Sequence, residues 1–112
     1  MLELLALADT YLAAARASDR GRSAEVVVHD GELRQTIIAL TAGSELSEHN
    51  SPPAASLQVL RGRVRVTDEP RSVEVPAGGL HLLTHHRHAV VAIEDCVFLL
   101  TTVTSVPSWV VA

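Results

Sequence analysis

Short segments of β-type sequence follow one another at close, even spacing from Ala24 onward, and this pattern limits the folds open to the chain. Asp30-Gly31 separates two such segments and is a hairpin signal. Around eight short strands joined by turns predict a β-sandwich or barrel. The expected strands are Glu25–His29, Arg34–Thr41, Leu57–Leu60, Arg63–Val66, Arg71–Val75, Leu80–Leu83, Arg87–Ile93 and Val97–Val103.

The composition agrees with one small domain of this kind. Hydrophobic residues make up 47 % of the 112 residues but aromatic residues only 3 %, so the core must consist of Val, Leu, Ile and Ala, a bias that suits strands. The net charge of −4 argues against a nucleic-acid partner. No apolar run approaches the ~18 residues that a membrane span needs, and the apolar start lacks the positive region of a signal peptide. We therefore expect a cytoplasmic protein without a membrane partner.

A helix is expected before the strands. Leu4, Leu7, Ala8, Tyr11, Leu12 and Ala15 fall on one stripe of such a helix, and Gly21 is a natural terminator. A helix this short is marginal in water, so its apolar stripe must pack on something. We expect residues 1–22 to form a helix packed on the outside of a β-domain at residues 23–112.

Three arginines, Arg61, Arg63 and Arg65, alternate along one predicted hairpin and have two interpretations. They could form a stripe that binds anions, or they could pair with acidic residues across the strands. Pairing on a solvated face is favoured, because opposite charges across strands stabilise a sheet by ~0.2–1 kcal/mol. A symmetric hairpin places Arg63 opposite Glu74. The single cysteine, Cys96, adjoins an apolar run and is expected to be a buried thiol.

Two glycines and one histidine have a distinctive spacing in the middle of the chain. His49 follows Gly43 by six residues, and Gly62 closes the stretch. This stretch resembles the first cupin motif, G-x5-H-x-H-x3-E-x6-G. Ser51 stands where the motif has its second histidine and Ala55 where it has its glutamate. A second stretch, from Gly78 to His88, resembles the second cupin motif with one residue fewer between its ends.

The chain is thus similar to short bacterial cupins that carry an N-terminal helix. The resemblance implies a mainly β protein, a double-stranded antiparallel β-barrel of the cupin or jelly-roll type, whose interior receives His49 and His88. Cupin metal sites usually gather three histidines and a glutamate around Fe, Mn, Ni or Zn. Because Ser51 is a poor ligand and Ala55 is none, we expect no metal or a weakly bound one. His86, two residues before His88, is the candidate third ligand.

Three functions stay open. A metal-free barrel would bind a small molecule, which is the favoured hypothesis, in a pocket made by His49, Ser51, Leu57, Val59, His88 and Val90. A metal-dependent enzyme, similar to cupin dioxygenases or isomerases, would use His49, His86 and His88 as ligands. A structural or regulatory cupin would have only a packed core.

A homodimer is expected as well. The apolar helix face and the tail Ser105–Ala112, which contains Trp109, supply more apolar surface than one small core can bury. Two-fold pairing is the commonest form of oligomer.

Overall fold

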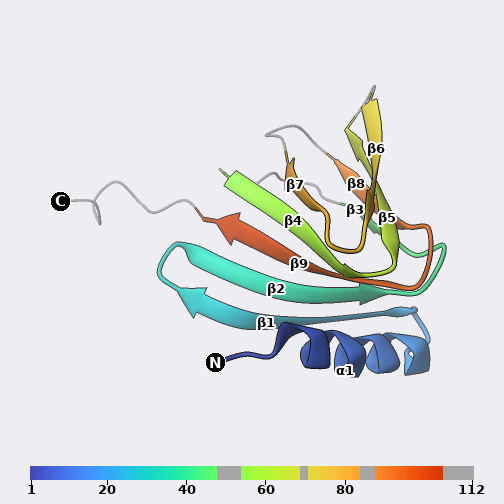
Figure 1. Cartoon of the computed structure of the whole chain (residues 1–112), viewed down its shortest axis with the longest axis horizontal. Coiled ribbons are helices and arrows are strands. Elements are labelled where there is room, and N and C mark those ends of the chain that lie inside the picture. The colour runs from blue at the N-terminus through green and yellow to red at the C-terminus, as the bar shows by residue number, and fades with distance from the viewer. Residues whose placement is uncertain (48–53, 69–70, 84–87, 105–112) are drawn as a thin grey trace.

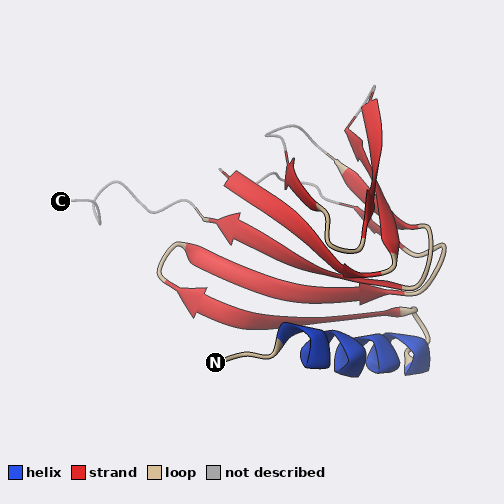
Figure 2. Ribbon diagram, in the orientation of Figure 1, coloured by secondary structure: helices blue, strands red, loops and turns tan. Residues whose placement is uncertain are grey.

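The computed structural model describes residues 1–47, 54–68, 71–83 and 88–104. Within these ranges the chain forms one helix followed by strands, as Figure 2 shows. The elements are α1 (Leu4–Ala17), β1 (Arg22–Asp30), β2 (Leu33–Leu40), β3 (Glu45–Ser47), β4 (Ala54–Arg61), β5 (Arg63–Asp68), β6 (Arg71–Pro76), β7 (Leu80–Leu83), β8 (Ala89–Ala92) and β9 (Cys96–Val103).

The strands form two antiparallel sheets that face each other (Figure 1). One sheet has the order β1-β2-β9-β4-β7, and the other has the order β3-β8-β5-β6. The mainly β fold with a single helix was predicted correctly. The two sheets share no strand pairing among the described residues. The arrangement is therefore a sandwich of jelly-roll type. The predicted closure into a barrel is not seen among the described residues.

Each predicted strand overlaps an observed strand, although Arg87–Ile93 shortens to β8 within the described residues, and the sequence did not reveal β3. That strand has three residues, too few for an alternating pattern to be recognised. It pairs with β8 and forms one edge of the smaller sheet. Short edge strands of this kind limit unwanted pairing with other chains.

The main core lies between the two sheets and follows directly from alternation along the strands. On β4, Ala55, Leu57 and Val59 are buried, while the residues between them are partly exposed. Full burial of a Leu or Val side chain contributes about 1.5–3 kcal/mol. The core contains Ile38, Leu40, Ala55, Leu57, Val59, Val64, Val66, Val75, Leu83, Val90, Ala92, Cys96 and Phe98.

Helix α1 covers part of the outer face of the larger sheet. Ala8, Leu12 and Ala15 are buried against that face, whereas Leu4 and Tyr11 are only partly buried. The sheet residues beneath the helix are Ile37, Ala39, Leu60, Val97 and Leu99. None of the helical structure in the described ranges is long and apolar enough to cross a membrane.

Two glycines of the first motif occupy backbone conformations that other residues rarely adopt. Gly43 has φ +88° and Gly62 has φ +74°. A Cβ at Gly62 would also collide with the Asp95 backbone carbonyl, where the turn between β4 and β5 meets the start of β9. Glycine is therefore favoured at these two motif positions for a structural reason that is independent of any metal chemistry.

The charged hairpin confirms cross-strand pairing but corrects its register. Arg65, not Arg63, lies opposite Glu74, because Asp68 still pairs with Arg71 and the strands extend further toward the turn than predicted. The Arg65 Nη2 and Glu74 Oε1 atoms are 3.0 Å apart, and Arg63 reaches the same carboxylate diagonally at 3.5 Å. Arg61 pairs instead with Asp9 of α1 at 3.1 Å.

Candidate ligand-binding site

Polar residues replace valine at the inward-facing positions of the β5–β6 hairpin as it approaches its turn. Val66 pairs with Val73, and the next inward pair is Asp68 with Arg71. Residues two apart on a strand share a face. Since Val66 is buried in the core, Asp68 lies on the core-facing side of β5, and Arg71 lies on that side of β6.

The opposite wall is β7, which presents a histidine at the same end. His81 pairs with Leu57 of β4, and Leu83 pairs with Ala55. Both β4 residues are buried, so His81 and Leu83 also face inward. Leu83 is buried, while His81 is half-buried because it lies at the opening between the sheets.

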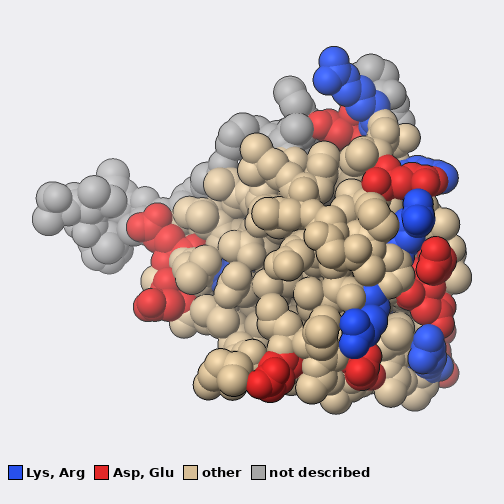
Figure 3. Space-filling model, viewed as in Figure 1, with Lys and Arg blue, Asp and Glu red and all other residues tan. Residues whose placement is uncertain are grey.

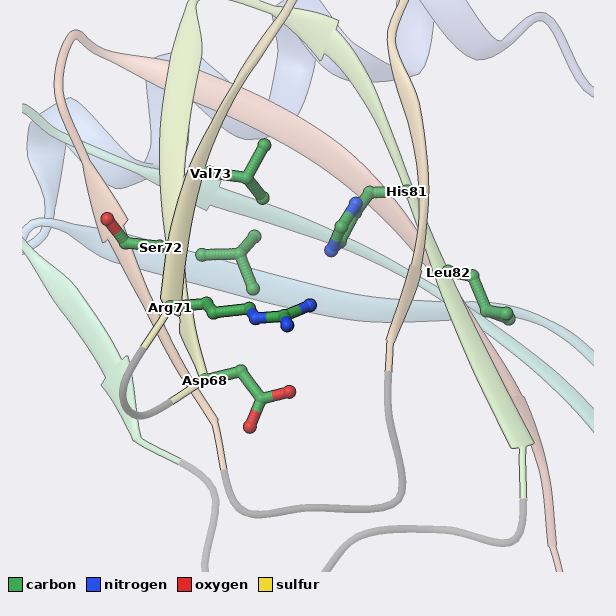
Figure 4. A pocket seen from close by; sticks show the side chains of 7 residues that line it. Asp68, Arg71, Ser72, Val73, His81 and Leu82 are labelled. Carbon is green, nitrogen blue, oxygen red and sulfur yellow. The ribbon is translucent and has the colours of Figure 1, made fainter.

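These two walls enclose a cavity of about 270 Å³. In Figure 4 the side chains of Arg71 and His81 point toward each other across it, with Asp68 below and Val73 above. Ser72 and Leu82 border the cavity, but their side chains point away from its centre. We call this cavity, lined by Val66, Asp68, Arg71, Ser72, Val73, His81 and Leu82, the open-end cavity.

His88 adds a second imidazole beside this cavity. It directly precedes β8 and is only 5 % exposed. The β5–β8 pairing ends at Thr67 with Ala89, so Asp68 and His88 occupy the next position along the two chains. Arg71, Asp68 and His88 thus belong to three neighbouring chain segments at one end of the smaller sheet, and their exposure falls from Arg71 to His88.

The surroundings of the Arg71 side chain differ from those of the three arginines on β4 and β5. Arg61, Arg63 and Arg65 each pair with a carboxylate on the outside of the molecule. Arg71 takes part in none of the ion pairs that join described residues. Figure 3 shows acidic and basic side chains side by side along the right-hand edge of the view and a wide uncharged surface at its centre.

The predicted site residues divide into two groups. His49, Ser51 and His86 lie outside the described residues. Leu57, Val59, His88 and Val90 all lie in the interior, at 0 %, 0 %, 5 % and 2 % exposure respectively. Leu57, Val59 and Val90 belong to the packed core, and the open-end cavity lies next to this core.

Sequence reasoning did not identify Asp68, Arg71 or His81 as site residues. Asp68 lay beyond the predicted strand Arg63–Val66, whereas it is the last residue of β5. The signal was present in the alternation, because Val64, Val66 and Asp68 follow one another at intervals of two. Extending that strand by one inward position would have identified Asp68 as an inward-facing residue.

No three histidine, cysteine, aspartate or glutamate side chains come close enough to hold a metal ion in the part of the chain that the structure describes. Two of the candidate ligands, His49 and His86, fall outside that part. The described residues alone do not make a metal site, and the set of His49, His86 and His88 stays a prediction.

No protein-family model matches the sequence, and no curated protein matches it. Solved structures do match. A conserved protein of unknown function from Streptococcus pyogenes has a TM-score of 0.71 at 24% identity over 80% of each chain. A cupin superfamily protein from Desulfitobacterium hafniense has a TM-score of 0.69 at 13% identity, over 75% of this chain and 78% of the other.

An RmlC-like cupin from Desulfovibrio desulfuricans is similar as well, with a TM-score of 0.65 and 22% identity over 73% of this chain and 81% of that one. Likeness at these identities establishes the fold. The chain has the cupin fold, as its glycine and histidine spacing predicted.

Proposed function

We propose that this cupin-fold protein binds a small organic molecule in the open-end cavity. The observation that carries the proposal is the convergence of Asp68, Arg71 and His81 on one cavity between the sheets. Binding sites are concave, mostly apolar and equipped with a few polar groups that orient the ligand. The open-end cavity has this character, since Val66 and Val73 supply apolar wall beside the three polar side chains.

The size of the cavity limits the ligand. Pockets for drug-sized ligands span about 300–1,000 Å³, and the open-end cavity measures about 270 Å³. A short metabolite fits this volume better than a nucleotide or an oligosaccharide. Val66, which belongs to the packed core, also lines the cavity, so the core bounds the cavity on that side.

A blocking substitution tests the proposal. Val73→Trp places a large ring at the cavity wall, and Val26→Trp is the control, since Val26 is a similarly exposed strand valine that does not line the cavity. Both proteins and the parent are screened by thermal denaturation against short carboxylic acids, polyols, sugars and amines. A ligand that binds only the native state raises the Tm.

We expect at least one compound class to raise the Tm of the parent and of Val26→Trp, but not of Val73→Trp. Equal shifts in all three proteins would place binding elsewhere and contradict the proposal. The absence of a shift with every class would contradict it as well.

A further inference from the structure

We infer that the ligand of the open-end cavity is a short hydroxy acid with one carboxylate, which Arg71 binds. This inference rests on the proposed function and specifies its ligand class. Three features of the cavity support it: the surroundings of Arg71, the presence of Asp68, and the apolar wall between them.

Arg71 supplies the anion specificity. Its guanidinium points into the cavity and pairs with no carboxylate among the described residues. A guanidinium presents a planar fork of N–H donors that matches a carboxylate, and such charge-assisted pairs are about twice as strong as neutral hydrogen bonds. Arg61, Arg63 and Arg65 already have carboxylate partners on the outer surface, whereas Arg71 lines the cavity and is positioned there to bind an anion.

Asp68 restricts the ligand to a single negative charge. It lies opposite Arg71 across the hairpin, so a second ligand carboxylate in this small cavity would lie near a like charge. Asp68 already has a partner within the protein, which disfavours its use as the main anchor for an amine. A carboxylate accepts several hydrogen bonds, so Asp68 can still accept one from a ligand hydroxyl.

The rest of the ligand is a short carbon chain. Val66 and Val73 form the wall between the polar groups, and His81 faces them from β7. The imidazole of His81 can donate to or accept from the ligand hydroxyl, according to its tautomer. A molecule such as 3-hydroxybutyrate combines one carboxylate, one hydroxyl and a short apolar body, and it serves as the probe.

A matched set of probes separates these contributions. 3-Hydroxybutyrate is compared with butyrate, which lacks the hydroxyl, with butane-1,3-diol, which lacks the charge, and with 4-aminobutan-2-ol, which reverses it. Dissociation constants are measured by NMR titration of ¹⁵N-labelled protein, a method that also detects weak binding. We expect the affinity to fall in the order 3-hydroxybutyrate, butyrate, diol, with the amine weakest.

Arg71→Gln removes the proposed anchor, and Arg34→Gln is its control. Arg34 is an exposed strand arginine that, like Arg71, has no ion pair with a described residue. The two variants therefore change the net charge equally. We expect Arg71→Gln to weaken 3-hydroxybutyrate binding by about tenfold or more, because a hydrogen bond to a charged group contributes about 1.5–3 kcal/mol. Arg34→Gln should leave it unchanged, and Arg71→Lys should restore part of it.

The outcomes distinguish the two levels of the proposal. Binding of the diol or the amine that Val73→Trp abolishes, with no preference for acids, would overturn the hydroxy-acid inference and leave the proposed function standing. Acid binding that survives Arg71→Gln would also overturn the inference. If no probe and no class in the thermal screen binds, both are wrong.

Discussion

Asp95 is the residue through which three parts of the fold are joined. Its Oδ1 accepts a hydrogen bond from the Ala42 backbone N–H at 2.8 Å, and its Oδ2 accepts one from Arg16 Nε at 2.8 Å. The first contact ties the turn before β9 to the turn after β2, and the second ties it to the last turn of α1. The Ala42 hydrogen bond, followed by the Arg16 guanidinium, lowers the pKa of the Asp95 carboxyl.

This carboxyl should make stability depend on pH. Because its pKa is lower in the folded state, its contribution is present above the ordinary aspartate pKa of about 4 and is lost as pH falls through the folded value. Asp95→Asn should therefore lower the Tm at pH 7, and the difference from the parent should shrink in acid. Glu94→Gln is the control, since Glu94 reaches Arg63 only at 3.8 Å. A Tm difference that stays constant from pH 7 to acid would contradict this account of Asp95.

The pKa of the neighbouring residue, Cys96, is shifted in the opposite direction. Burial raises the pKa of its thiol to about 12. The predicted buried thiol is confirmed, and it is unsuited to nucleophilic chemistry because the thiolate is the reactive form.

At the scale of elements, helix α1 is held on the sheet by a few apolar side chains. Leu12 is 8 % exposed and packs against the sheet, whereas Leu5 on the same helix is 52 % exposed. Leu12→Ala should reduce the free energy of unfolding by about 2–5 kcal/mol, as large-to-small changes at buried leucines do. Leu5→Ala, with the same change in helix propensity, should alter it by less than about 0.5 kcal/mol. Equal effects in urea denaturation would show that the helix is not docked as described.

The strands show what local sequence can and cannot reveal. The Asp30-Gly31 signal and the alternation of Arg63–Val66 predicted two hairpins correctly, because both depend on neighbouring residues. The predicted register of the second hairpin was wrong by two residues. The predicted strands left four residues between Val66 and Arg71, whereas in the structure Asp68 already pairs with Arg71. The same error left Asp68 outside the predicted strand, so its place two residues after Val66 on the inward face was not recognised.

For the whole molecule, the fold followed from the spacing of a few glycines and a histidine, but the site did not. Gly43 and Gly62 lie in turns whose positive φ favours glycine, whatever the protein binds. The open-end cavity instead requires β7 of one sheet to face the β5–β6 hairpin of the other, a relation between segments that no local pattern encodes.

The homodimer expected from the apolar helix face and Trp109 stays a prediction, which light scattering before and after Trp109→Glu would test.

The position of the ligand is the central claim, and the histidine side chains report on it most directly. His81 lines the open-end cavity, whereas His29 is an exposed residue of β1 that does not. Their imidazole Cε1–H resonances are assigned with His81→Gln and His29→Gln and followed during titration with 3-hydroxybutyrate at constant pH. The account predicts a saturable shift of the His81 resonance with none at His29, and a shift at His29 with an unmoved His81 would contradict it.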